Sequence, residues 1–190
     1  MSVVEPLPTP NLWLEPPNMP LTRADLDRMP DDGRRYELID GVLLVSPGPA
    51  IRHQIVAGNL SDLLRRACPA DMLALFAPVD VVLATDTVLQ PDLVVAARED
   101  FGKQDLPGAP LLAVEVLSPS TRRFDLMLKF SRLEAAGCQA YWVVDPDTPS
   151  LIAWELQDGA YVQVAKATGG EAAHLTSPYE VTVVPADLIS

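Results

Sequence analysis

The chain has few of the residues that hold small or metal-stapled proteins together. Its two cysteines, Cys68 and Cys138, lie far apart and form no CxxC or Cys-His spacing. A disulfide framework needs regularly spaced pairs of cysteines, and a structural zinc site needs a cluster of cysteines and histidines. We therefore expect neither of them in this protein.

Long apolar runs are also missing. No run approaches the roughly 18–20 residues that a helix needs to cross a bilayer. The N-terminus does not combine a basic start with a continuous apolar segment, as a secretory signal would. We therefore expect a cytoplasmic protein with no membrane segment.

Positive charge is scarce, since 14 lysines and arginines stand against 26 acids and give a net charge of −12. This balance argues against broad, non-specific binding to nucleic acid. The charge is uneven, however, because residues 122–132 hold four basic residues and one acid. That cluster is either a solvated helix face or a place where a polyanion is bound.

The length and the position of the prolines predict the domain organisation. A chain of 190 residues with 48% hydrophobic residues can bury the core of one ordinary domain. Six prolines in residues 1–20 predict an extended tail over residues 1–21, with Leu12, Trp13 and Leu14 as its apolar contacts. The single domain is expected over residues 22–190.

The remaining pattern predicts a mixed central β-sheet flanked by helices, an α/β fold. Asp40-Gly41 and Asp158-Gly159 each predict a tight hairpin turn between apolar segments. Amphipathic spacing predicts long helices over residues 51–67 and 121–136, and an apolar run predicts a strand at 111–117 that is covered on both faces. The other expected elements are a capped helix at 23–29, strands within 72–84, 87–95 and 140–145, a loop at 99–110, and a last strand at 179–184.

Two acidic residues stand in or beside apolar runs. Asp92 follows Pro91 between two short strands, and Glu115 is the only polar residue of the segment 111–117. A buried carboxylate is costly unless it is paired or binds a metal. Mg²⁺ is commonly held by one or two carboxylates and keeps its other positions for water and phosphate oxygens. In the plainer alternative, Asp92 caps a turn and Glu115 pairs with an arginine.

Asp125 and Lys129 are one turn apart on the expected helix 121–136 and so share a face. The long stem of Lys129 could reach over the strand end, where its amine would orient a water molecule or stabilise developing charge. Alternatively, the two residues form a surface pair worth a few tenths of a kcal/mol. Phe124, Leu128 and Leu133 are expected on the buried side of this helix.

Two further side chains are candidates for the site. Glu37 alternates with Tyr36 and Leu38 in its strand, so it faces either the site or solvent. His53, in the first turn of the helix 51–67, could act as an acid, a base or a phosphate contact, although a structural role is the plainer alternative.

In their order along the chain, these motifs resemble the PD-(D/E)xK nuclease superfamily. They resemble more closely the bacterial Uma-type family of putative restriction endonucleases. The resemblance covers residues 22–185. Its components are Tyr36 to Gly41, His53, Gln90 to Asp92, Glu115 to Thr121, Asp125 with Lys129, and Gly137 to Asp145.

The resemblance implies a restriction-endonuclease-like fold and a metal-dependent endonuclease that hydrolyses phosphodiester bonds, with DNA as the expected substrate. It implies Asp92 and Glu115 as ligands of Mg²⁺ or Mn²⁺, Lys129 as the catalytic lysine and Glu37 as a supporting acid. The superfamily pattern places its lysine two residues after the second acid, where this chain has Leu117. In the Uma-type pattern the lysine lies on the following helix, at the position of Lys129.

The chain also departs from its relatives at Leu133 and Ala140, where they often carry a tyrosine and a glutamate. Two alternative functions stay open. A member that kept the fold but lost catalysis would act as an interaction or assembly module, which the acidic composition favours. A hydrolase of a small phosphorylated molecule would need no basic surface. A homodimer would suit an enzyme that cuts both strands of DNA, but no pattern in the sequence locates an interface.

Overall fold

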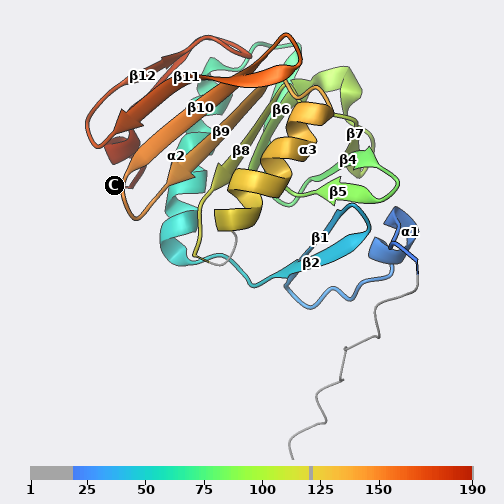
Figure 1. The fold of residues 1–190 in the computed structure, drawn as a ribbon. Coiled ribbons are helices and arrows are strands. Elements are labelled where there is room, and N and C mark those ends of the chain that lie inside the picture. The colour runs from blue at the N-terminus through green and yellow to red at the C-terminus, as the bar shows by residue number, and fades with distance from the viewer. Residues whose placement is uncertain (1–18, 120–121, 190) are drawn as a thin grey trace, which may run out of the picture.

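The computed structural model describes residues 19–119 and 122–189 (Figure 1). Most of the tail expected over residues 1–21, with its apolar residues Leu12, Trp13 and Leu14, lies outside these ranges. Within them, the backbone N–H of Leu21 donates a hydrogen bond of 2.9 Å to the carbonyl of Gly41. No helix in the described ranges is long and apolar enough to cross a membrane.

A six-stranded mixed sheet forms the centre of the molecule, as the sequence predicts. Its order is β11-β10-β9-β8-β6-β3, and only the central pair β8 and β9 is parallel. The strands are β3 (Met72–Phe76), β6 (Leu93–Ala97), β8 (Leu112–Val116), β9 (Ala140–Asp145), β10 (Ser150–Gln157) and β11 (Ala160–Thr168).

Helices cover both faces of this sheet, which explains why β8 and β9 are almost entirely apolar. Helix α2 (Ile51–Ala67) lies behind the sheet in Figure 1 and packs Leu60 and Leu64 into a core with Trp142. Helix α3 (Phe130–Ala135) lies in front and packs Leu133 against Tyr141. The helix expected over residues 51–67 is confirmed as α2, although Ile51 and Ile55 in its first turns are exposed.

A second sheet lies beside the first, with the order β2-β1-β5-β4-β7. The hairpin of β1 (Arg35–Ile39) and β2 (Val42–Ser46) is confirmed, and its turn holds Asp40 and Gly41 at positive φ of 52° and 75°. The other strands are β4 (Asp80–Ala84), β5 (Thr87–Leu89) and β7 (Asp105–Pro107).

The expected loop over 99–110 is wrong in part. A short 3₁₀-helix, η1 (Arg98–Asp100), begins the segment, and β7 pairs in parallel with β4. A three-residue strand has no alternation that a sequence pattern could reveal, so only its partner strand defines it.

The small elements at the ends are shorter than expected. Helix α1 (Arg23–Leu26) begins at the predicted capping box, where the N–H and the hydroxyl of Thr22 both donate to Asp25 Oδ2. The last strand, β13 (Val181–Val183), pairs with an unexpected strand β12 (Ala173–Leu175). A 3₁₀-helix, η3 (Pro185–Ile189), follows it.

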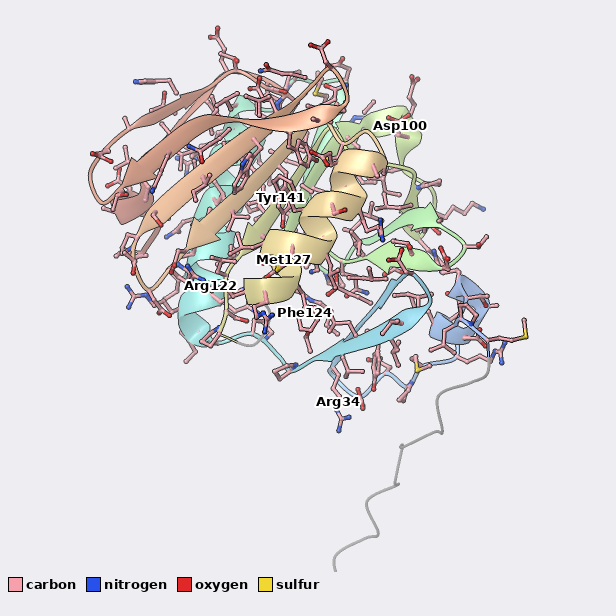
Figure 2. The ribbon with its side chains drawn as sticks, viewed as in Figure 1. Arg34, Asp100, Arg122, Phe124, Met127 and Tyr141 are labelled. Carbon is pink, nitrogen blue, oxygen red and sulfur yellow. The ribbon has the colours of Figure 1, made fainter. Side chains whose placement is uncertain are left out.

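The helix expected over 121–136 is only partly α-helical. Within the described residues a π-helix, η2 (Phe124–Lys129), runs directly into α3, and Gly137 at positive φ follows the end of the helix. The wider π-turn rotates side chains away from the α-helical pattern. Leu128, expected on the buried side, is therefore 41% exposed, whereas Lys129 is 1% exposed. Figure 2 shows Met127 on this helix, in front of the sheet that carries Tyr141.

The two cysteines are free thiols in different surroundings. Cys138 is buried, and burial raises the pKa of its thiol to about 11, whereas Cys68 is partly exposed. Because the thiolate is the reactive form, we expect a thiol reagent at about pH 8 to label one cysteine per native chain, at Cys68, and two per unfolded chain. Rapid labelling of both cysteines in the native protein would contradict the packing of Cys138.

Candidate active site

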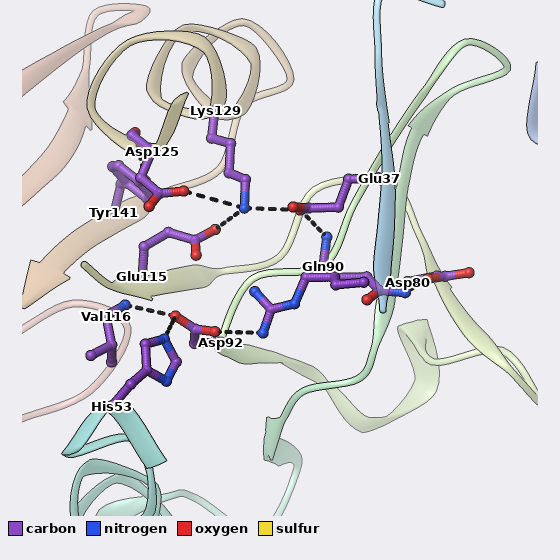
Figure 3. A network of polar contacts seen from close by, with 11 residues as sticks. Glu37, His53, Asp80, Gln90, Asp92, Glu115, Val116, Asp125, Lys129 and Tyr141 are labelled. Carbon is purple, nitrogen blue, oxygen red and sulfur yellow. Dashed lines mark hydrogen bonds and ion pairs between the residues drawn. The ribbon is translucent and has the colours of Figure 1, made fainter. Parts of the chain in front are cut away.

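Asp92 and Glu115 are carried by neighbouring strands of the central sheet. The antiparallel register of β6 and β8 pairs Leu93 with Val114, so the residue before β6 lies opposite Glu115. Asp92 Oδ2 accepts a hydrogen bond of 2.8 Å from the N–H of Val116. Both carboxylates are buried, and Figure 3 shows them in two adjacent groups of polar contacts, one around Asp92 and one that joins Glu115 to Lys129. The structure thus brings together the two predicted metal ligands.

The Asp92 carboxylate is bound by two cationic or polar side chains from other elements. Arg35 Nη2, on β1, donates to Oδ1 at 2.8 Å, and His53 Nε2, in the first turn of α2, lies 3.0 Å from Oδ2. Burial alone would raise the pKa of Asp92. The hydrogen bond from His53 and the charge of Arg35 outweigh it and lower the pKa of Asp92 to about 2. Asp92 is therefore a permanent anion near neutral pH, and it does more than cap a turn.

Lys129 lies in a nest of three carboxylates. Its Nζ is 2.9 Å from Glu37 Oε1, 3.0 Å from Glu115 Oε1 and 3.3 Å from Asp125 Oδ1. Burial lowers the pKa of Lys129, but the surrounding carboxylates raise it by a larger amount, so the net shift of the pKa is upward. Lys129 is therefore charged, and Asp125 and Lys129 form a buried pair and not the surface pair of the alternative interpretation.

The surroundings of Glu115 disfavour its ionised form. Burial raises its pKa, Lys129 lowers it, and the neighbouring Asp125 raises it again, which leaves the pKa well above the usual value. The single positive charge of Lys129 cannot neutralise the three carboxylates around it. An additional cation next to Glu115 would therefore relieve the cluster.

Glu37 faces the site and not solvent, which settles the alternative left open by its strand pattern. Its Oε1 also accepts a hydrogen bond of 2.7 Å from the N–H of Gln90, two residues before Asp92. The side-chain amide of Gln90 in turn donates a hydrogen bond of 2.7 Å from Nε2 to Asp80 Oδ1. Glu37 thus links Lys129 to the segment that carries Asp92.

The π-helix is fixed to the sheet below the site. The hydroxyl of Tyr141, on β9, donates a hydrogen bond of 2.8 Å to the backbone carbonyl of Asp125. Tyr141 is fully buried, and no pattern in the sequence indicated this contact. It holds the turn that presents Asp125 and Lys129 to Glu115.

The predicted basic cluster of residues 122–132 does not form a continuous basic face. Lys129 is buried in the site, Arg122 pairs with Asp145 at 2.7 Å, and Arg132 pairs with Asp40. The sequence missed a second basic residue that reaches the site, Arg35. The only signal for it was its place in the segment that also contains Glu37.

A cavity opens onto the two predicted metal ligands. It has a volume of about 230 Å³, and its walls include Asp92, Glu115, Arg35, His53 and the loop that leads into α2. A neighbouring cavity of about 320 Å³ is also lined by Asp92 and Arg35. The carboxylates are thus accessible to a small ion although their side chains are buried.

The donor set fits a magnesium-type ion held by two carboxylates. Mg²⁺ and Mn²⁺ prefer oxygen ligands, and two carboxylates on a cavity wall leave the remaining positions to water or phosphate. The excess negative charge around Glu115 favours the same ion. Among the described residues, no group of three or more His, Cys, Asp or Glu side chains is arranged to hold a metal.

Comparison with known proteins agrees with the fold. A solved structure of a protein from Anabaena variabilis, described as a putative nuclease of the DUF820 family, has a TM-score of 0.69 with this chain at 17% identity. The match covers 90% of this chain and 98% of that one, and at this identity it shows a shared fold. No protein with a curated description matches the chain.

The family model Uma2, described as "Putative restriction endonuclease", matches residues 23–184. The match includes Glu37, Asp92, Glu115 and Lys129. It agrees with the resemblance that the motifs carry, and it covers all but the ends of the chain. The chain therefore belongs to the Uma2 family of putative restriction endonucleases.

Proposed function

We propose that this protein is an endonuclease that hydrolyses phosphodiester bonds in DNA with the help of Mg²⁺ or Mn²⁺. The observation that carries the proposal is the convergence of Asp92 and Glu115 on one cavity, with Lys129 3.0 Å from Glu115. Membership of a family described as restriction endonucleases supports it, as does the fold shared with a protein described as a nuclease. The homodimer and the cytoplasmic location stay predictions.

The two carboxylates supply the chemistry by holding the ion. A divalent ion bound by Asp92 and Glu115 supplies Lewis-acid polarisation of a phosphoryl oxygen and activates water near neutral pH. Asp92 is suited to this task because its low pKa keeps it ionised. Glu115 is suited because it lines the cavity and is held at one oxygen by Lys129.

Lys129 acts on Glu115 in this proposal. An ammonium group has three N–H donors, and three carboxylates lie within 3.3 Å of Nζ. The amine therefore has no donor left for water or phosphate in this arrangement. Its contribution is to lower the pKa of Glu115 and to orient that carboxylate, while Glu37 and Asp125 hold the amine in place.

The phosphate backbone must be bound locally, because the protein carries a net charge of −12. Arg35 and His53 stand at the cavity beside Asp92. The first turn of α2 contains no acidic residue, and its N-cap Ala50, also on the cavity wall, offers no side-chain cap to the first amides. The positive end of this helix therefore faces the place where a phosphate would lie.

A plasmid assay tests the proposal. The wild type is expected to nick supercoiled DNA with Mg²⁺ or Mn²⁺ and to be inactive with a chelator. Asp92→Asn should lower the rate by at least about 10³-fold, a barrier increase of about 4 kcal/mol. Asp71→Asn, a change at an exposed acid far from the site, should leave the rate unchanged. Equal nicking by wild type and Asp92→Asn would contradict the proposal. An RNA of matching sequence, assayed in parallel, shows whether the enzyme cleaves DNA or RNA.

One observation favours a second function, an interaction module that kept the fold. Protein groups already occupy both oxygens of Asp92, which a closed structural network would also show. In that case the wild type cleaves neither DNA nor RNA and does not bind Mn²⁺. A partner protein co-purifies with it. Mn²⁺ binding that disappears in Glu115→Gln would exclude this alternative.

A further inference from the structure

Arg35 stands between the two cavities that meet at Asp92, and it lines both of them. Its side chain, at the start of β1, is 20% exposed, so the guanidinium can be reached from solvent. The structure gives this group one hydrogen bond, from Nη2 to Asp92 Oδ1. A guanidinium carries five N–H donors. Four of them therefore have no acceptor among the described residues.

Arg35 also competes with the proposed function of Asp92. A divalent ion that binds this carboxylate meets a guanidinium already 2.8 Å from one of its oxygens. Two cations cannot both bind this carboxylate with full affinity, because they repel each other and compete for the same negative charge. Binding of the ion therefore weakens the pair between Arg35 and Asp92.

A guanidinium released from Asp92 needs an anionic partner at the same cavity. Its planar fork of donors matches two oxygens of a phosphate, which a lysine amine does not. The phosphodiester of a substrate at the ion would supply such oxygens. The ion and the substrate would thus strengthen each other's binding through one side chain.

We propose that Arg35 binds the substrate phosphate, and that it exchanges the Asp92 carboxylate for that phosphate when a divalent ion occupies Asp92. The inference rests on the proposed function, because it needs Asp92 as an ion ligand and a phosphodiester as substrate. It assigns to Arg35 two opposite effects. In the free protein Arg35 weakens the binding of the ion, and in the loaded protein it strengthens the binding of DNA.

The first experiment measures Mn²⁺ binding without nucleic acid, by calorimetry. Arg35→Met removes the competing cation and should tighten Mn²⁺ binding by about tenfold, within the usual range of coupling between two ligands. Arg34→Met is the matched control. Arg34 is the neighbouring residue, its side chain is 61% exposed, and it pairs with Asp32 and not with Asp92. It should leave Mn²⁺ binding unchanged.

The second experiment measures binding of a short DNA duplex by fluorescence anisotropy, with Ca²⁺ in place of the catalytic ion. Arg35→Met should weaken this binding by about tenfold and lower the slope of log K against log salt concentration by about one. Arg35→Lys should keep the slope but recover only part of the affinity, since it lacks the fork. Arg66→Met, at the other end of α2, should change neither quantity.

The opposite signs of the two effects separate this inference from a structural role. A variant that merely disturbs the site would weaken both Mn²⁺ and DNA binding, and that result, or no change in either, would overturn the role of Arg35 while leaving the proposed function in place. Thermal unfolding confirms that the variants are folded. A wild type that binds no Mn²⁺ would overturn the proposed function and this inference with it.

Discussion

Replacing Lys129 with methionine is expected to lower the free energy of unfolding by about 3–5 kcal/mol at about pH 8. Methionine has a similar length and fills most of the same space, so the loss does not come from a cavity. It comes from Glu37, Glu115 and Asp125, which remain buried around the former amine without their shared cation. Uncompensated buried charges are among the most destabilising features a folded chain can contain.

This loss should shrink as the pH falls from about 8 to about 5. Without Lys129, the pKa of Glu115 in the folded state, which burial already raises, rises further, whereas in the unfolded chain it returns to its ordinary value of 4.5. In that pH range the folded state binds protons that the unfolded state does not, so lowering the pH stabilises the folded variant. Urea unfolding, followed by circular dichroism at both pH values, measures the effect.

Arg122→Met is the control for the removal of a basic residue from the same helical region. Arg122 pairs with Asp145, but its side chain is 53% exposed. Loss of such a surface pair should cost less than about 1 kcal/mol and show little change over the same pH range. A Lys129→Met variant that loses no more than this control would mean that Lys129 does not compensate the cluster.

Replacing Glu115 with glutamine is expected to separate activity from stability. Metal-dependent nicking should fall by at least about 10³-fold, because a neutral amide is a poor ligand for a divalent ion. The free energy of unfolding should stay the same or increase. Glutamine fills the same space, Lys129 keeps Glu37 and Asp125, and the cluster loses one of its excess negative charges.

The direction of the Glu115 shift gives this prediction a pH dependence. Because the pKa of Glu115 is raised in the folded state, the folded wild type becomes less stable as the pH rises from the ordinary value of 4.5 toward the raised pKa. Glu115→Gln lacks this titration, so its stability relative to wild type should grow with pH. Glu99→Gln, a change at an exposed acid, should alter neither activity nor stability. A Glu115→Gln variant that is several kcal/mol less stable, or still active, would contradict the assignment.

The parts of the fold that could be predicted from the sequence are those that local chemistry fixes. Asp40 and Gly41 adopt the positive φ values that a tight hairpin turn needs, and Gly137 ends a helix in the same way. The apolar run around Glu115 could only be a strand covered on both faces. A carboxylate in or beside such a run is costly enough to need a reason, which makes Asp92 and Glu115 candidates, and the resemblance to the Uma-type family is what implies a role for them as metal ligands.

The parts that could not be predicted depend on contacts between distant segments. Arg35 lies 57 residues before Asp92, and nothing in the sequence around either residue signals their pair. The π-helix also makes tertiary contacts, since Lys129 turns inward toward Glu37 and Glu115 and the hydroxyl of Tyr141 donates to the carbonyl of Asp125. An amphipathic pattern assigns charged residues to the outside. It therefore placed Leu128 inside, where the structure has Lys129.

The most direct test of the central claim is a crystal of the wild type soaked in Mn²⁺ and measured for anomalous scattering. We predict one strong peak per chain, between the carboxylates of Asp92 and Glu115, with the side chain of Lys129 still on Glu115. A peak at another position would contradict the claim that these two acids share one divalent ion. The absence of any peak at the cavity in a crystal saturated with Mn²⁺ would contradict it equally.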